Sequence, residues 1–159
     1  MADTYIQVYI QAVFAVRGRE SLISSRHKDE IFKYIAGTLK ENGQKLMAIN
    51  GMPDHVHILF GMSGTIALSD LIKEIKASSS RLINDKKCLR GHFNWQAGFG
   101  AFSYSRSQVP RVAAYIENQE RHHARRSFRD EYTTLLKRFE VEYDPKYLFE
   151  FMDNARGHS

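Results

Sequence analysis

The sequence predicts an α+β fold of the ferredoxin-like class, in which a β-α-β-β-α-β segment forms an antiparallel sheet with two helices on one face and the other face open. Three observations predict this class: alternation of apolar residues near the N-terminus, a tight turn joining two later apolar runs, and a helical repeat on either side of that pair. No Pro-, Gly- or Ser-rich linker interrupts the 159 residues, so one domain over residues 1–159 is predicted.

The first strand is predicted over residues 5–16, where every even-numbered residue is apolar. This period of two gives a strand with one buried face. A helix follows, because Ser24 or Ser25 can cap its N-terminus and Asn42-Gly43 can end it.

Two further strands, predicted over residues 45–50 and 55–62, form an antiparallel hairpin, because only a turn at residues 51–54 separates them. The second helix is predicted from Leu68 to Ile83, where apolar residues recur every three or four positions.

The remaining elements complete the sheet and extend beyond it. A fourth strand is predicted from Phe99 to Tyr104, weakened by its glycines. Two more helices are predicted, over about residues 108–126 and over residues 128–139. The first of these two helices carries Tyr115.

Composition excludes several classes of protein. The formal net charge is +5, which is compatible with binding nucleic-acid phosphates. Cys88 is the single cysteine, so an internal disulfide and a cysteine-based zinc site are excluded. No apolar run is long enough to cross a bilayer and the N-terminus lacks a signal-peptide pattern, so a cytoplasmic location without a membrane partner is expected.

His55 and His57 lie two residues apart in the predicted strand over residues 55–62. Because successive side chains of a strand point to opposite faces, both imidazoles project from the face opposite Val56 and Ile58. Two imidazoles so placed could ligate one metal ion. A solvated strand surface would explain the same pair, and so short a motif does not decide between the two interpretations.

Tyr115 and Gln119 lie one turn apart on the helix predicted over residues 108–126, beside the apolar residues Val112 and Ile116. The tyrosine hydroxyl could act as a nucleophile while the carboxamide oxygen reaches a metal. Alternatively, Tyr115 packs at the edge of a core and Gln119 is an exposed helix former. The residues leave both interpretations open.

Three segments together resemble the single-tyrosine HUH transposases, the IS-two-hundred-like transposases of small bacterial insertion sequences. They are His55-Val56-His57, the stretch Trp95–Ser103, and Tyr115–Gln119 leading into His122-His123. The resemblance covers nearly the whole chain. The order and spacing of the three segments are specific, although each segment alone is not.

The resemblance implies that His55 and His57 ligate a divalent metal, Mg²⁺ or Mn²⁺, that Gln119 is the third protein ligand, and that Tyr115 is the nucleophile. It implies a transposase that is a metal-dependent single-strand DNA endonuclease and strand transferase. Such an enzyme forms a 5′-phosphotyrosine intermediate on single-stranded or hairpin element ends. It also implies a homodimer with composite sites, in which Tyr115 of one chain serves the metal site of its partner in trans.

Basic residues gather near the second helix and after the helix of Tyr115. Such residues usually form a solvated face, but beside a DNA-cleaving site some are expected to contact phosphates. The candidates for DNA binding are Lys73, Lys76, Arg81, Arg121 and Arg125.

Three other functions stay open at the level of sequence. One of them, a metal-dependent hydrolase with water as the nucleophile, would leave Tyr115 without a role. A non-catalytic module for single-stranded nucleic acid would use aromatic side chains on the open sheet face, where this sequence has His55 and His57. A domesticated relative that cuts palindromes of host repeats would carry the same site as a mobile transposase, so the sequence does not separate these two.

Overall fold

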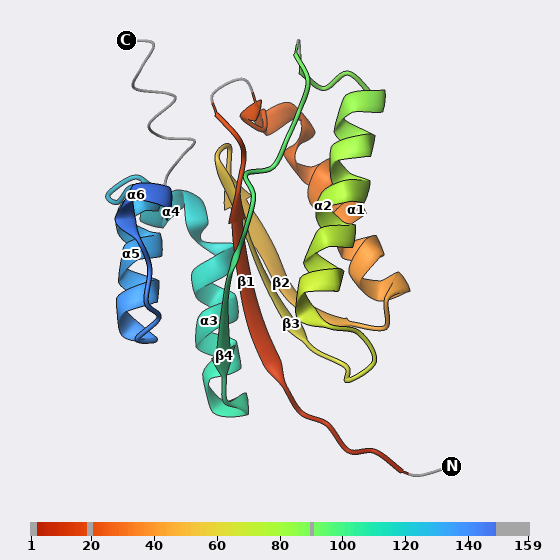
Figure 1. The fold of residues 1–159 in the computed structure, drawn as a ribbon, viewed down its shortest axis with the longest axis vertical. Coiled ribbons are helices and arrows are strands. Elements are labelled where there is room, and N and C mark those ends of the chain that lie inside the picture. Colours follow the sequence, from red (N-terminus) through yellow and green to blue (C-terminus); the bar gives the residue numbers. More distant parts are fainter. Residues whose placement is uncertain (1–2, 19–20, 90, 149–159) are drawn as a thin grey trace.

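The computed structural model describes residues 3–18, 21–89 and 91–148 of the chain. At its centre is a four-stranded antiparallel sheet with the strand order β2-β3-β1-β4 (Figure 1). The sheet and its first two helices are β1 (Tyr9–Ala15), α1 (Ser25–Glu41), β2 (Lys45–Met52), β3 (His55–Gly61), α2 (Leu68–Asp85) and β4 (Gly100–Tyr104). This order confirms the predicted β-α-β-β-α-β fold.

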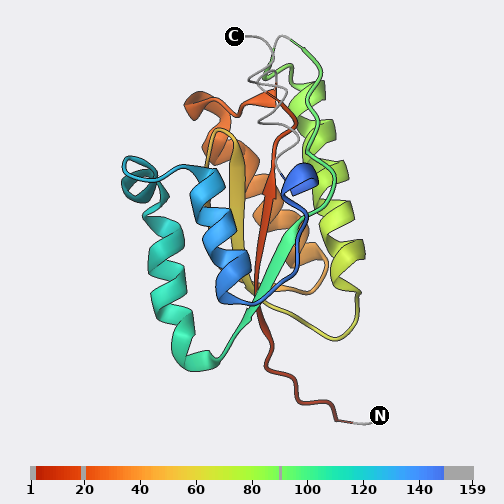
Figure 2. The ribbon, with the colours of Figure 1, turned by 60° about the vertical axis from the view of Figure 1, so that its left-hand side comes forward.

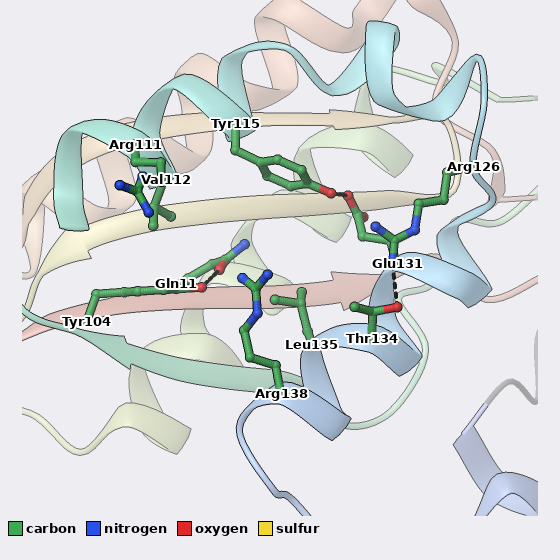
Figure 3. A pocket seen from close by; sticks show the side chains of 10 residues that line it. All are labelled: Gln11, Tyr104, Arg111, Val112, Tyr115, Arg126, Glu131, Thr134, Leu135 and Arg138. Carbon is green, nitrogen blue, oxygen red and sulfur yellow. Dashed lines mark hydrogen bonds between the residues drawn. The ribbon is translucent and has the colours of Figure 1, made fainter.

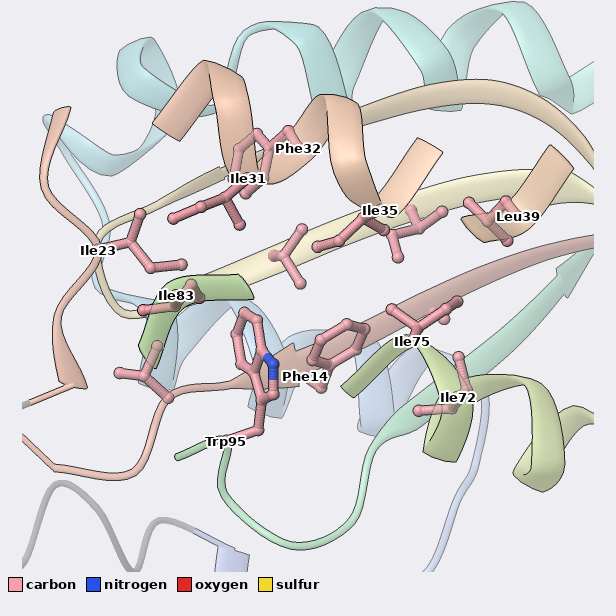
Figure 4. Packing of buried hydrophobic residues seen from close by; sticks show 14 of the residues in the cluster. Phe14, Ile23, Ile31, Phe32, Ile35, Leu39, Ile72, Ile75, Ile83 and Trp95 are labelled. Carbon is pink, nitrogen blue, oxygen red and sulfur yellow. The ribbon is translucent and has the colours of Figure 1, made fainter. Parts of the chain in front are cut away.

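One face of the sheet packs on α1 and α2 and forms the main core. The core includes Phe14 from β1, Ile58 from β3, Ile35 from α1 and Ile75 from α2, each at most 2% exposed (Figure 4). The even-numbered residues of β1 and β3 enter this core. Because side chains alternate along a strand, the odd-numbered residues of β3 face the opposite side.

The opposite face is covered by the C-terminal helices, whereas the sequence interpretation left it open (Figures 1 and 2). These elements are the short 3-10 helix η2 (Arg106–Gln108), α3 (Val109–Glu117), α4 (Gln119–His123), α5 (Phe128–Arg138) and α6 (Pro145–Leu148). Ile116 of α3 packs against Leu59, and Leu135 of α5 packs against Val13. Burial of these apolar side chains holds the helices on the sheet. None of the helices in the described ranges is long and apolar enough to span a membrane.

Two strand boundaries differ from the prediction. β1 begins at Tyr9 rather than at residue 5, and Tyr5 is 91% exposed. The alternating pattern therefore extends beyond the paired strand. β2 continues to Met52, which pairs with His55, so the turn of the hairpin shrinks to residues 53–54.

The helix predicted over residues 108–126 is interrupted at Asn118, between α3 and α4. The Asn118 side chain donates a hydrogen bond to the carbonyl of Ala114 at 2.8 Å. By such bonds asparagine competes with the regular helical ladder. The interruption lies directly before Gln119.

Gly51 of β2 sets the close approach of the hairpin that presents His55. A Cβ atom at position 51 would lie 2.1 Å from the backbone oxygen of His55 and 2.9 Å from the Cα of Val56. Gly51→Ala is therefore expected to push the two strands apart and lower the free energy of unfolding by about 1–3 kcal/mol in a urea titration. The matched control is Gly37→Ala in α1, where a Cβ would meet nothing within 4 Å. An unchanged stability of Gly51→Ala would contradict this packing.

Candidate active site

The histidine pair lies on the sheet face beneath the C-terminal helices. His55 and His57 are both fully buried. Their outer ring nitrogens have fixed partners: His55 Nδ1 lies 2.6 Å from Asp54 Oδ1, and His57 Nδ1 lies 2.9 Å from the amide nitrogen of Gln11. The Nε2 atoms of both rings consequently face the interior of the cluster. The paired orientation agrees with the alternation of the strand.

Glu131 of α5 supplies the anion that these imidazoles face. Its side chain is buried, and its Oε1 lies 2.7 Å from His57 Nε2, 3.1 Å from His123 Nε2 and 3.4 Å from His55 Nε2. A buried carboxylate needs such partners, because the loss of hydration would otherwise be costly. Three imidazoles from β3 and α4 therefore surround one oxygen of Glu131.

The second oxygen of Glu131 meets the two residues predicted on the helix of the tyrosine. The Tyr115 hydroxyl donates a hydrogen bond to Glu131 Oε2 (Figure 3). Gln119 Nε2 donates to the same atom at 3.1 Å. Gln119 is fully buried, and its Oε1 lies 3.0 Å from His55 Nε2. The structure thus brings all four predicted site residues to one cluster within a single chain.

The cluster distributes its charge unevenly. Burial raises the pKa of the Glu131 carboxyl, but hydrogen bonds from His123, His55 and His57 outweigh burial and hold that pKa far below its usual range. Burial lowers the pKa of His55, but its hydrogen bonds to Asp54 and Glu131 outweigh burial and raise that pKa to about 9. For His57 burial prevails and the pKa is lowered. Near neutral pH the site therefore holds an ionised Glu131, a protonated His55 and a neutral His57.

The Tyr115 hydroxyl keeps its proton in this environment. Burial raises its pKa, and the hydrogen bond to the Glu131 carboxylate raises it further, well above the ordinary value for tyrosine. The ring stacks on His122 with the ring centroids 4.2 Å apart. The phenol is therefore held in place and aimed at Glu131, with its proton still bound.

The donor set of the cluster fits a divalent metal ion. One ligand atom each from His55, His57 and Glu131 lie within 4.8 Å of one another, and Gln119 Oε1 faces the same space. Imidazole nitrogens with carboxylate and amide oxygens form a mixed set that suits Mn²⁺ and is compatible with Mg²⁺. Coordination through Nε2 would require each imidazole to be neutral with its proton on Nδ1. For His57 this means that the Gln11 amide would turn its oxygen toward Nδ1 in place of its nitrogen.

Sequence reasoning missed Glu131 and His123. Glu131 lies 74 positions from His57, so nothing local to the His-x-His motif pointed to it. One signal was available: Glu131 follows Phe128 by three positions and precedes Leu135 by four, so a carboxylate occupies the apolar stripe of α5. A charged residue at such a position is buried only with a partner.

The residues predicted to bind DNA divide into two groups. Lys73, Lys76 and Arg81 lie on α2, across the sheet from the cluster, and Lys76 donates hydrogen bonds to the carbonyls of residues 96 and 98. Arg121 and Arg125 are exposed and lie in and just after α4, on the same side as the cluster.

Residues 4–119 match the family model described as IS200-like transposase, and the protein belongs to this family. The matched residues include the whole sheet and end at Gln119, so α5 with Glu131 follows them. A curated relative, the ISDra2 transposase TnpA of Deinococcus radiodurans, is 24% identical over 118 residues, which are 71% of this chain and 84% of the relative.

Two solved structures share the fold. A candidate transposase from Deinococcus radiodurans R1 is 23% identical, with a TM-score of 0.58 over 75% of this chain and 96% of that one. A REP-associated tyrosine transposase bound to a REP hairpin is 17% identical, with a TM-score of 0.55 over 74% of this chain and 70% of that one.

Binding of Mn²⁺ is expected to release about one proton at pH 7, because His55 is protonated below a pKa of about 9 and must become neutral to coordinate, whereas His57 is already neutral. Affinity should therefore rise with pH up to about 9 and level off above it. Calorimetric titrations in buffers of different ionisation enthalpy measure the protons released.

Asp54→Asn is the matched variant for this titration. It removes a carboxylate that raises the pKa of His55, so fewer protons should be released at pH 7. Equal heats of Mn²⁺ binding in all buffers at pH 7 would contradict this distribution of charge.

Proposed function

We propose that the protein is a metal-dependent single-strand DNA endonuclease and strand transferase with Tyr115 as its nucleophile. Its divalent cofactor, Mg²⁺ or Mn²⁺, is held by His55, His57 and Gln119, with Glu131 completing the cluster. One observation carries the proposal: Glu131 contacts His57 Nε2 with one oxygen and the Tyr115 hydroxyl with the other. A single carboxylate thereby joins the candidate metal ligands to the candidate nucleophile.

Tyr115 supplies the nucleophile of the cleavage step, and Glu131 positions it. The phenol oxygen of Tyr115 attacks the scissile phosphorus, and the bond from phosphorus to the 3′ oxygen breaks. Because the phenol holds its proton in the resting site and the low pKa of Glu131 makes that carboxylate a weak base, the proton leaves the phenol only as the new bond forms, while the hydrogen bond to Glu131 Oε2 orients the hydroxyl. The proton that leaves Tyr115 is balanced by one that the departing 3′ oxygen takes up from solvent. The products are a 5′-phosphotyrosine and a free 3′ hydroxyl.

The surrounding residues hold the cluster in this arrangement. When bound, a divalent ion supplies positive charge to the phosphoryl oxygens. Asp54 and Gln11 fix the two imidazole rings from behind, and His122 stacks against the Tyr115 ring. The phosphotyrosine ester keeps the strand activated, so a 3′ hydroxyl can attack it in the reverse reaction and no ATP is needed.

Single-stranded or hairpin DNA is the proposed substrate. Membership of the IS200-like transposase family and the net charge of +5 support this choice. A non-catalytic module would present stacking aromatics on the open sheet face, but here α3 and α5 cover that face and His55, His57 and Glu131 are buried beneath them. Flanking genomic DNA separates a mobile transposase from a domesticated relative, because palindromes at both ends of the gene indicate mobility.

Tyr115→Phe is expected to abolish covalent capture of DNA, because the change removes the attacking oxygen and keeps the ring. The test incubates the protein with labelled single-stranded DNA from the ends of its own gene and Mn²⁺, followed by a denaturing gel. The free energy of unfolding should fall by only about 1–3 kcal/mol, since one hydrogen bond to a charged group is lost.

The control for that experiment is Tyr104→Phe. The Tyr104 hydroxyl donates to Gln11 Oε1 at 2.6 Å and does not contact Glu131, so covalent product should persist. Covalent product from Tyr115→Phe but none from Tyr104→Phe would transfer the role of nucleophile to Tyr104.

The homodimer with composite sites stays a prediction of the family resemblance, and a mixing experiment tests it. A Tyr115→Phe subunit is mixed with a His55→Ala/His57→Ala subunit. If Tyr115 serves the partner chain, each heterodimer recovers one working site of two. In the single chain Tyr115 already contacts Glu131 of its own cluster, so a site complete within one chain gives no recovery. No recovery after confirmed subunit exchange therefore contradicts the trans arrangement.

A further inference from the structure

A cavity of about 240 Å³ opens beside Tyr115, between α3 and α5 and over β1 and β4 (Figure 3). Tyr115 and Glu131 form part of its wall, so the cavity begins where the proposed cleavage step takes place. The same two helices also contribute apolar side chains to the wall, Val112 from α3 and Leu135 from α5.

Three arginines from three separate segments line the cavity: Arg111 on α3, Arg126 between α4 and α5, and Arg138 at the end of α5. Arg126 already donates hydrogen bonds to the Asp130 carbonyl and the Thr134 hydroxyl. Within the described ranges, no ion pair joins Arg111 or Arg138 to a carboxylate.

The acidic residue that lines this cavity is already hydrogen-bonded to other groups. Among its lining residues in the described chain, Glu131 is the one acid, and both of its oxygens are engaged by His57, Gln119 and other cluster partners. The cavity therefore carries an excess of positive charge on three guanidinium groups, because the partners of Arg126 are neutral. Among the described residues, Arg111 and Arg138 have no hydrogen-bond acceptor, so their donors are available to a ligand. A guanidinium presents a planar set of donors that matches the oxygens of a phosphate.

The size and lining of the cavity indicate which kind of phosphate-bearing ligand it can bind. Its volume of about 240 Å³ lies just under the range of about 300–1,000 Å³ that is usual for sites that bury a whole drug-sized ligand. The open cavity therefore takes part of one unpaired nucleotide and is far too small for a duplex. A single nucleotide unit presents an anionic phosphate and apolar faces of base and sugar together. The wall offers both kinds of partner, with arginines beside Val112 and Leu135.

We propose that this cavity binds the nucleotide that flanks the scissile phosphate of an unpaired DNA strand, with the flanking phosphate held between Arg111 and Arg138. This inference rests on the proposed function of Tyr115. Tyr115 lies at one end of the subsite. The scissile phosphate would lie at its hydroxyl, and the adjoining nucleotide of the strand would lie in the cavity. Arg111 and Arg138 are binding residues for the substrate, in addition to the metal and the nucleophile.

The first test measures how salt weakens binding of a labelled single-stranded oligonucleotide taken from the ends of the gene. All proteins carry Tyr115→Phe, so that binding is measured without covalent capture, and Mn²⁺ is present. Arg111→Ala and Arg138→Ala should each make the negative slope of log K against log salt shallower by about 0.7, which is the effect of one lost phosphate contact on a single strand. The same loss corresponds to about fivefold weaker binding at 0.1 M salt.

Lys137→Ala and Arg106→Ala are the matched controls. Both residues are exposed cations, next to Arg138 on α5 and near Arg111 at η2, and neither lines the cavity. They should leave the slope close to that of the parent protein. Equal slope changes in the controls and in the two cavity variants would overturn the proposal, because the effect would then come from general charge. Thermal unfolding of each variant verifies that the fold is retained.

The second test locates the contact on the strand. The position of the cut is first mapped from the covalent product of the wild-type protein. Two shortened oligonucleotides are then made: one ends so that it lacks the nucleotide on the 5′ side of the cut, and the other lacks the nucleotide on the 3′ side. The penalty of Arg138→Ala should vanish for one of these shortened strands and persist for the other. A penalty that is the same for every strand would also overturn the subsite.

The two tests separate this inference from the proposed function. Absence of a covalent product from the wild-type protein would contradict the proposed function itself. A covalent product together with arginine variants that bind like Lys137→Ala would leave the proposed function standing and refute the nucleotide subsite alone.

Discussion

The buried carboxylate of Glu131 is the constraint on which the arrangement of the active face depends. Its side chain is 2% exposed, and a carboxylate removed from water needs charged or hydrogen-bonding partners. His55 and His57 come from β3, and the other partners come from α3 and α4. Satisfying this one charge therefore requires the C-terminal helices to fold back over the sheet. Removal of one partner from a buried ion pair typically costs about 3–5 kcal/mol.

The same charge organises the chemistry of the site on two sides of Tyr115. On one side, Glu131 and the inward-facing imidazoles form a centre that attracts a cation. On the other side, Arg111 and Arg138 line a cavity that attracts an anion. A DNA strand with its scissile phosphate at the Tyr115 hydroxyl would touch both. Glu131 lines the same cavity as the two arginines, but its oxygens are engaged by the imidazoles, Tyr115 and Gln119, and no ion pair joins it to Arg111 or Arg138 in the described ranges.

Much of this could be predicted from local patterns, because those patterns have local physical causes. Strand alternation placed His55 and His57 on one face, and helical spacing placed Tyr115 near Gln119. The interruption at Asn118 was missed, because a side-chain bond to the backbone competes with helix formation in a way that periodicity does not reveal. Glu131 was missed because its partners are distant in sequence. Arg111 and Arg138 were missed for the same reason, since α3 and α5 meet only in the folded chain.

The central claim is that the Glu131 cluster is a metal site sharing its carboxylate with the nucleophile. Anomalous diffraction at the manganese edge, from crystals of the protein soaked in Mn²⁺, tests this claim most directly. The account expects one strong peak within coordination distance of the Nε2 atoms of His55 and His57, on the side of Gln119 and Glu131. Manganese bound elsewhere, with both imidazoles still hydrogen-bonded to Glu131, would contradict the account.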